Sequence, residues 1–210
     1  MNSIFDIHFK EYDGWYERHR FAYLSELKAL KKVTPHKGKG LEIGVGTARF
    51  AVPLKIKYGI DPSKNMLKIA KKRGIKTFLG KGEKLPFADK SFDFVLIAIT
   101  ICFVDNPEKV IAESYRVLKS HGKIIVGIVD RNSFLGRFYL KEKKQGHRFY
   151  KYANFFSTEE IKKMLKKYNF MEIAVFQTVF QLPENMKRIE KPKTGFGRGG
   201  FTVITGKKKN

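Results

Sequence analysis

Two glycines directly after a short apolar run form the first group of residues that could do chemistry. They stand in Gly44-Val45-Gly46-Thr47, two positions after Glu42. A glycine has no Cβ, so a bound ligand can come close to the backbone amides of such a turn. The carboxylate of Glu42 would repel a pyrophosphate and attract an ammonium group. Dinucleotide-binding turns have a third glycine where this chain has Arg49, so the pattern favours a ligand that carries an amino group.

A second carboxylate, Asp61, occurs in Gly59-Ile60-Asp61-Pro62-Ser63. At the end of a second strand, its two oxygens can accept hydrogen bonds from both ribose hydroxyls of an adenosine. By itself, Asp61 would be interpreted as a turn residue before Pro62. Together with the first motif, it indicates an adenosine that carries an amino acid, and the pattern favours S-adenosylmethionine (SAM) over NAD.

The elements that must position these residues alternate along the chain. Short apolar runs separated by amphipathic stretches are typical of a parallel sheet with helices on both faces. We expect one α/β domain over residues 1–210, with a Rossmann-like, doubly wound, mostly parallel seven-stranded sheet and a C-terminal antiparallel hairpin. The predicted strands are residues 41–43, 57–60, 75–79, 92–98 and 124–129, followed by 170–180 and 201–204 as the hairpin.

Capping residues predict where the helices begin. A leading helix is expected over residues 15–32 and a second over 63–73, capped by Ser63. Asp105-Asn106-Pro107 predicts another helix start, with proline in the first turn. Ser157 and Glu160 form a capping-box pattern before a further helix.

Two segments do not fit this scaffold as layers. They are about residues 1–20 and residues 131–156, and the second mixes glycine, aromatic and basic residues. Both should lie near the carboxyl ends of the strands, where open α/β sheets bind ligands. We therefore predict that they are lids. The aromatic residues of the second segment either line an apolar acceptor pocket or pack the lid itself.

Six motifs in order resemble the class I SAM-dependent methyltransferases, in particular the subgroup of quinone-biosynthesis and other small-molecule methyltransferases. The resemblance covers about residues 12–180. Its motifs are Tyr12-Asp13-Gly14-Trp15-Tyr16, Leu41-Glu42-Ile43-Gly44-Val45-Gly46-Thr47, Gly59-Ile60-Asp61-Pro62-Ser63 with Met66-Leu67, Glu83-Lys84-Leu85-Pro86-Phe87, Ser91-Phe92-Asp93-Phe94-Val95, and Arg116-Val117-Leu118-Lys119 before Gly122.

The resemblance implies SAM as cofactor and assigns residues to it. The first motif would pack against the methionine portion, with Glu42 ordering its amino group, while Asp61 would hold the ribose. Met66, Gly82 and Glu83 would surround the adenine. The expected cofactor-binding residues are Tyr16, Glu42, Gly44, Val45, Gly46, Asp61, Pro62, Met66, Gly82, Glu83 and Ala98.

The chain departs from the family pattern at four places. Ala48 replaces a third glycine, and its small side chain should still permit close helix packing. Lys81 stands where an aspartate is frequent; because an ammonium accepts no hydrogen bond, adenine recognition would rely on the Gly82 amide. Cys102-Phe103 replaces a frequent His-His pair and removes a possible acid-base residue. Ser120-His121-Gly122 replaces Pro-Gly-Gly as a variant turn.

Methyl transfer from a sulfonium is an in-line displacement from an activated donor, so alignment and exclusion of water are the main requirements. A base is needed only when the acceptor must first lose a proton. Candidates are His147, Tyr150, Asp130 and His19, and none is assigned as catalytic. Cys102 has no second cysteine at ligand spacing and is interpreted as a buried structural thiol, so no metal site is predicted.

The charge bears on the partners. Lys and Arg number 43 and Asp and Glu 20, which gives a net charge of +23 and attracts polyanions. The basic residues are nevertheless spread over predicted helix faces, as on a lysine-rich solvated surface. We expect a small-molecule or lipid-like acceptor, with RNA methylation as the alternative and a non-catalytic SAM-binding protein as a third class. An anionic membrane surface could present a lipid substrate.

The location follows from the same composition. The first six residues lack a signal-peptide pattern, no apolar run is long enough for a membrane span, and there is one cysteine. A reducing cytoplasm is therefore expected. The sequence predicts no oligomeric state.

Overall fold

The computed structural model describes residues 4–209, which form one eight-stranded sheet in the order β3-β2-β1-β4-β5-β8-β6-β7. Neighbouring strands from β3 to β5 are parallel, and β8 is antiparallel to both β5 and β6. The strands are β1 (Gly40–Ile43), β2 (Tyr58–Asp61), β3 (Lys76–Leu79), β4 (Phe92–Ala98), β5 (Leu118–Val129), β6 (Phe170–Thr178), β7 (Lys193–Thr194) and β8 (Phe201–Lys208).

This sheet confirms the predicted α/β class and the antiparallel pairing of the last two long strands. The one addition is β7, a two-residue strand that pairs with β6 at the sheet edge and that has no apolar pattern to predict it. The helical elements are α1 (Ile4–Ile7), α2 (Phe9–Arg18), α3 (Arg20–Val33), α4 (Lys64–Lys72), η1 (Ile101–Phe103), α5 (Pro107–Val117), α6 (Phe134–Lys144), η2 (Tyr150–Tyr152), α7 (Thr158–Lys167) and η3 (Pro183–Asn185).

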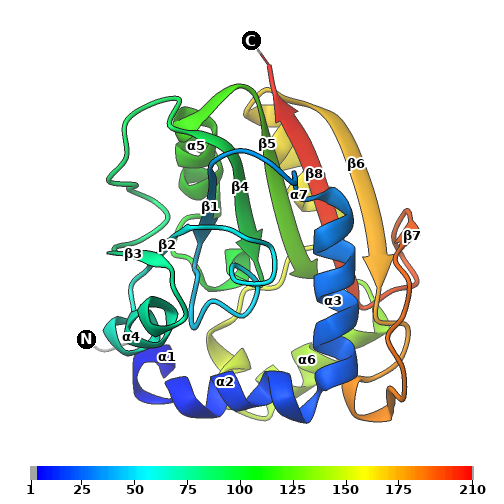
Figure 1. Ribbon diagram of the computed structural model, residues 1–210. Helices are drawn as coiled ribbons and strands as arrows, with labels where there is room; N and C mark the ends of the chain where they lie inside the picture. The colour runs from blue at the N-terminus through cyan, green and yellow to red at the C-terminus, as the bar shows by residue number, and fades with distance from the viewer. Residues whose placement is uncertain (1–3, 210) are drawn as a thin grey trace.

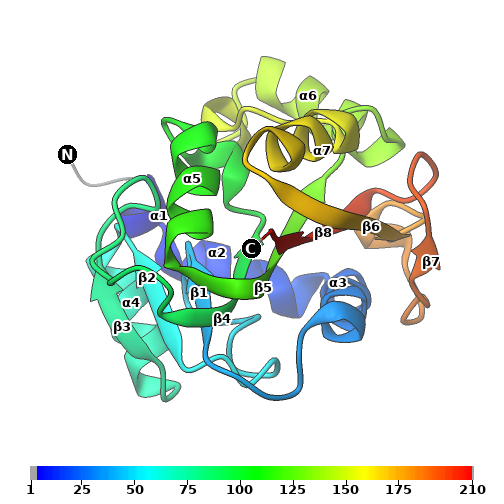
Figure 2. The same cartoon turned by 90° about the horizontal axis from the view of Figure 1, so that it is seen from above.

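Helices cover both faces of the sheet. Figure 2 shows α5 and α7 on one face and α3 and α4 on the other. The alternation of side chains along β4 explains this arrangement, because successive residues of a strand point to opposite faces. Phe94 and Leu96 belong to the core on the α3 side, whereas Val95 and Ile97 belong to the core on the α5 side. All four are buried, so each face needs its own layer of helices.

The predicted helix starts at Ser63, Asn106 and Ser157 are confirmed. Each side chain accepts a hydrogen bond from a backbone N–H in the first turn, and Ser157 forms the full capping box with Glu160. The predicted single helix over residues 15–32 is wrong. At His19, with φ −115° and ψ 46°, the backbone leaves the helical region and separates α2 from α3. The helical spacing of apolar residues continues across this break, so it does not reveal the change of direction.

The break at His19 lets α2 run across one end of the molecule while α3 packs along the sheet (Figure 1). In that view α1, α2 and α6 lie below the sheet, at the end to which the arrowheads of β4 and β5 point. We call residues 4–19 the N-terminal segment and residues 131–156 the inserted segment. Residues 1–3 of the first predicted lid lie outside the described residues.

Within the described part of the chain, none of the helices combines the length and the apolar character that crossing a membrane requires.

Candidate functional site

The turn after β1 is held against the end of β2. The N–H groups of Gly44 and Val45 both donate to the carbonyl oxygen of Ile60, at 2.8 and 3.0 Å. Gly44 has a φ of +71°, and a Cβ on it would lie 2.2 Å from the side chain of Thr100. Glycine is required here for its conformation and for its lack of a side chain. The turn therefore presents bare backbone at the carboxyl ends of the strands.

Asp61 ties this turn to the next helix. Its Oδ2 accepts a hydrogen bond from the Gly46 N–H at 2.9 Å, and its Oδ1 accepts one from the Ser63 N–H at 2.8 Å. Burial raises the pKa of Asp61, and the two N–H donors oppose that effect. Each oxygen keeps a lone pair for a further donor, so Asp61 can hold a ligand hydroxyl without releasing the turn.

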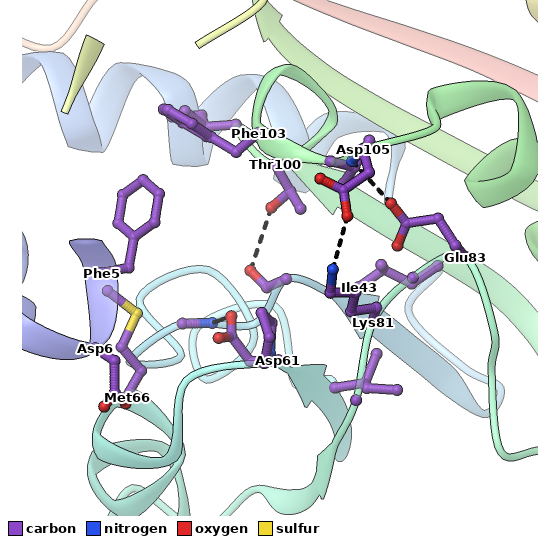
Figure 3. A pocket seen from close by; sticks show the side chains of 18 of the residues that line it. Phe5, Asp6, Ile43, Asp61, Met66, Lys81, Glu83, Thr100, Phe103 and Asp105 are labelled. Atoms are coloured by element: carbon purple, nitrogen blue, oxygen red, sulfur yellow. Dashed lines mark hydrogen bonds and ion pairs between the residues drawn. The ribbon is translucent and has the colours of Figure 1, made fainter. Parts of the chain in front are cut away.

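A cavity of about 410 Å³ opens beside Asp61. In Figure 3, Phe5 and Met66 lie on one side of it and Lys81 and Asp105 on the opposite side. The lining residues are Phe5, Asp6, Tyr12, Ile43, Gly44, Gly46, Ile60, Asp61, Pro62, Lys64, Met66, Gly80, Lys81, Gly82, Glu83, Ile99, Thr100, Phe103, Val104 and Asp105. The size is that of a small-molecule site.

Glu42 lies behind the turn, next to a second space of about 20 Å³, which holds about one water molecule. Its neighbours Leu41 and Ile43 face the α5 side, so Glu42 points to the opposite side of the sheet. The carboxylate is 1% exposed, and its Oε2 has no hydrogen-bond partner among the described residues. Burial raises the pKa of Glu42 well above its usual range. A buried acceptor without a partner calls for a donor from outside the protein.

All the cofactor-binding residues predicted from the sequence lie around these two spaces. Seven line the larger cavity: Gly44, Gly46, Asp61, Pro62, Met66, Gly82 and Glu83. The other four line the smaller one: Tyr16, Glu42, Val45 and Ala98. Gly44 and Gly46 line both, so the glycine turn separates the two spaces.

The side of the cavity with Lys81 is organised by hydrogen bonds among its own residues. The Nζ of Lys81 donates to Asp105 Oδ2 at 2.6 Å, and Glu83 Oε1 accepts the backbone N–H groups of Asp105 and Asn106 (Figure 3). Glu83 therefore holds the turn before α5. Asp105 brings a carboxylate to the same rim as Lys81, where the family often has an aspartate.

The N-terminal segment is clamped to the glycine turn by Asp13. This carboxylate accepts hydrogen bonds from Thr47 and from the guanidinium groups of Arg49 and Arg73, with Nη2–Oδ2 distances of 2.7 and 2.9 Å. Burial would raise the pKa of Asp13, but the hydrogen bonds from Arg49 and Arg73 hold it well below its usual range. Arg49, which breaks the dinucleotide pattern, thus has a structural role.

The departure at Ala48 has a different consequence from the one expected. Residues 44–57 form turns rather than a helix between β1 and β2, so Ala48 has no helix to pack. Ala48 is buried and has a φ of +68°, in the left-handed region that glycine tolerates best.

Sequence reasoning missed several residues that line the cavity, among them Phe5, Asp6, Thr100, Phe103 and Asp105. Asp6 accepts hydrogen bonds from Ser63 Oγ and from the Asn65 N–H, at the start of α4. The prediction of a lid over the first residues was the available signal for Phe5 and Asp6, because the partners of Asp6 and the partners Phe103 and Phe149 of Phe5 are more than 50 positions away.

The candidate bases are engaged elsewhere. Asp130 accepts hydrogen bonds from the N–H and Oγ1 of Thr158, and the ring of His19 stacks on Trp15. His147 stacks on Tyr150 at 4.2 Å. The Cys102 thiol donates to the Ile99 carbonyl oxygen, and burial raises its pKa to about 12. None of these residues lines either space.

Known proteins share this architecture. Residues 41–126 match a family model described as a methyltransferase domain. An uncharacterized protein of Methanocaldococcus jannaschii is 52% identical over 206 residues, which cover 98% of this chain and 99% of that protein. A crystal structure from Thermotoga maritima, described as a SAM-dependent methyltransferase and possible histamine N-methyltransferase, has a TM-score of 0.95 and 54% identity, with 98% of each chain covered.

The chain belongs to the class I SAM-dependent methyltransferases. A demethylmenaquinone methyltransferase of a Geobacillus species is 30% identical over 140 residues, which cover 60% of this methyltransferase and 55% of that protein. The chain described here is therefore an enzyme with SAM as its cofactor, as its sequence motifs implied.

The site of this methyltransferase fits SAM on its own chemistry. The space that a Cβ at Gly44 would fill is left open for backbone contact. The unpartnered Oε2 of Glu42 suits an ammonium donor, and Asp61 faces a cavity with room for a nucleoside.

Proposed function

We propose that this methyltransferase transfers the methyl group of SAM to a small-molecule or lipid-like acceptor. The observation that carries the proposal is the aromatic closure over the cavity. Phe149 of the inserted segment stacks on Phe5 at 5.6 Å and meets Tyr12 edge-on at 5.9 Å, and Phe5 and Tyr12 both line the cavity. A concave space with aromatic rings on one side suits a small acceptor better than a folded polynucleotide.

The residues around the two spaces would divide the cofactor between them. Asp61 would accept the ribose hydroxyls, Glu42 would order the ammonium group across the smaller space, and Met66 and Gly82 would flank the adenine. The Gly44 turn would contact the methionine portion, and Tyr16 would close the smaller space. When bound, SAM supplies an activated methyl group, so the protein must mainly align the acceptor and exclude water.

We further propose one domain over residues 1–210 with the N-terminal and inserted segments as its lids. Both segments cover the ends of the strands and meet each other through Phe5, Tyr12 and Phe149. The relation to the demethylmenaquinone methyltransferase supports an acceptor with lipid character. The single cysteine, a free and half-buried thiol, supports a reducing cytoplasm as the location.

Incubation with methyl-labelled SAM, once with a metabolite extract and once with total RNA, tests the proposal. We expect label in the small-molecule or lipid fraction. The charge of +23 favours RNA as the alternative acceptor, and label confined to RNA would replace the proposal with that one.

A further inference from the structure

Helix α3 carries a glutamate in the middle of its buried face. Ala22, Glu26, Ala29 and Leu30 follow the spacing of a helix face, and all four are buried. Glu26 is 2% exposed, and its Oε2 has no hydrogen-bond partner among the described residues. Glutamate is almost never buried without a partner, because an unpaired carboxylate loses its hydration. Helix packing alone therefore does not account for Glu26.

Tyrosines from four elements lie within electrostatic reach of this carboxylate. Burial is the main cause of their raised pKa values, and the charge of Glu26 raises each pKa further. We call these residues the tyrosine box: Tyr12 and Tyr16 of α2, Tyr23 of α3, Tyr139 of α6 and Tyr150 of η2. Their rings pack in two groups, one of Tyr12, Tyr16 and Tyr23 and one of Tyr139 and Tyr150. Tyr139 stacks on Tyr150 at 4.2 Å, and Tyr16 meets Tyr23 edge-on at 5.1 Å.

The tyrosine box shares a wall with the cofactor site. Tyr12 lines both spaces, Tyr16 lines the smaller one, and the Tyr16 hydroxyl donates to the Tyr12 hydroxyl at 3.1 Å. Glu26 itself lines neither space. The Tyr12–Tyr16 pair therefore joins the surroundings of Glu26 to the cofactor site.

We propose that Glu26 and the tyrosine box bind the methyl acceptor, and that this acceptor is an amine. An ammonium group supplies the donors that the carboxylate lacks, and the faces of tyrosine rings attract a cation. A neutral acceptor supplies no charge that could pair with an ionised Glu26. The inference rests on the proposed small-molecule function and assigns the chemical class of the acceptor. The inserted segment, which carries Tyr139 and Tyr150, must move aside to admit it.

The surroundings of Glu26 also suit proton transfer. Burial alone raises its pKa to about 8, and no Lys, Arg or His contributes to the shift. Glu26 is thus protonated at neutral pH in the free protein, and it releases that proton when an ammonium group binds beside it. The bound ammonium then gives one proton to the carboxylate, which leaves a lone pair on the amine nitrogen.

With that lone pair the nitrogen forms a bond to the methyl carbon as the carbon–sulfur bond breaks, and the electron pair of that bond stays on sulfur. The methylated amine leaves as a cation, and Glu26 is again protonated, as in the free protein. A group with a pKa near the working pH is well suited to exchange a proton in this way.

Calorimetry on the protein loaded with the demethylated cofactor tests the proposal. The probes are phenethylamine, histamine and the neutral analogue 2-phenylethanol. The variant is Glu26→Gln, and the control is Glu159→Gln, the same change at an exposed position of α7 on the other face of the sheet. We expect the amines to bind the wild type and the control equally and Glu26→Gln at least about tenfold more weakly, with SAM affinity unchanged.

Proton release gives a readout that a merely structural role would not move. In buffers of different ionisation enthalpy at pH 7, phenethylamine should release up to about one proton from the wild type and none from Glu26→Gln. Should Glu26→Gln fail to fold, Glu26→Met replaces the carboxylate by an apolar side chain of similar size and must show the same loss of amine binding.

Binding of 2-phenylethanol as tight as that of phenethylamine, equal amine binding by wild type and variant, or no amine binding at millimolar concentration would each overturn the inference. Label transfer to small molecules that Glu26→Gln leaves unchanged would refute the amine site alone. Absence of transfer to any small-molecule fraction would instead refute the proposed function.

Discussion

The two segments over the strand ends are held in opposite ways. The N-terminal segment is fixed by charges, because Asp6 caps the start of α4 and Asp13 binds Arg49 and Arg73. The inserted segment is held over the site mainly by rings, because Phe149 packs against Phe5 and Tyr12 of the N-terminal segment. Charged hydrogen bonds fix distance and direction, whereas ring contacts tolerate sliding.

This difference indicates a division of labour. The N-terminal segment completes the side of the site that would hold the cofactor, which every reaction cycle needs in the same geometry. The inserted segment covers the side next to Glu26, through which an acceptor would enter and a product would leave. Polar contacts fix its ends, where Asp130 binds Thr158 and the Arg131 N–H donates to the Phe156 carbonyl oxygen. Its middle adds the half-exposed ion pair of Arg148 with Glu11 of the N-terminal segment. Because such pairs contribute only about 0–1 kcal/mol, the middle can still open as a unit.

The largest expected effect comes from the unpaired acid on the ring-held side. The pKa of Glu26 is raised to about 8 in the folded protein, so the folded state binds a proton that the unfolded chain has lost above about pH 4.3. This group therefore stabilises the protein fully below that pH, and the contribution is lost as pH rises to 8.

Glu26→Gln should remove this pH dependence. Between pH 5 and pH 9, the free energy of unfolding measured in urea should therefore fall by about 3–5 kcal/mol more in the wild type than in the variant. Glu159→Gln serves as control, with a slope like that of the wild type. If the free energy of unfolding changed with pH equally in the wild type and in Glu26→Gln, Glu26 would have an ordinary pKa. The contrast between the charge-held and the ring-held segment would then be removed.

The next largest effect is expected at Asp13, which clamps the N-terminal segment to the glycine turn. Asp13→Ala removes the carboxylate that Arg49 and Arg73 share, and only Arg49 keeps another ion pair, with Glu17. We expect a loss of about 2–3 kcal/mol in the free energy of unfolding at pH 7. SAM affinity should fall about tenfold or more by calorimetry, because the segment no longer closes on the glycine turn. Since the pKa of Asp13 is lowered by its partners, the stability difference should narrow as pH falls below about 4.

Glu11→Ala is the matched control on the same helix, because Glu11 forms a half-exposed ion pair with Arg148. Such pairs contribute about 0–1 kcal/mol. Equal effects of Asp13→Ala and Glu11→Ala would contradict the charge-held interpretation of this segment.

Phe149→Ala tests the ring-held segment. It removes contacts with Phe5 and Tyr12, so we expect the KM for the acceptor to rise about tenfold, equivalent to about 1.4 kcal/mol, while SAM affinity changes less than about threefold. Steady-state kinetics with an acceptor from the labelling assay, together with calorimetry for SAM, separate the two. If Phe149→Ala weakened SAM binding as much as it raised the KM for the acceptor, the two segments would act as one cover.

The smallest effect is expected where the inserted segment ends. Ser157→Ala removes the side-chain half of the capping box with Glu160 and should cost about 1 kcal/mol in urea unfolding, as helix caps do. Kinetic parameters should stay those of the wild type. A changed acceptor KM would show that the end of the segment, and not only its rings, controls access.

The parts of the site that local chemistry determines were predictable from the sequence. The glycine turn, Asp61 after a strand, and the capping box all depend on residues a few positions apart. Contacts between residues far apart in the sequence could not be predicted. Asp13 meets Arg73 from 60 positions away, and Glu26 falls on an amphipathic helix where a polar residue ordinarily faces water. The break at His19 was hidden for a similar reason, since the apolar spacing of α2 continues into α3.

The position of β8 has a consequence for synthesis of the chain. This late segment lies between β5 and β6, and its Phe201 is fully buried. Until residues 201–208 have been made, β5 and β6 present unpaired backbone edges, which favour aggregation. The C-terminal half of the sheet can therefore close only late in translation, and a nascent chain stalled before Phe201 should be a substrate for chaperones.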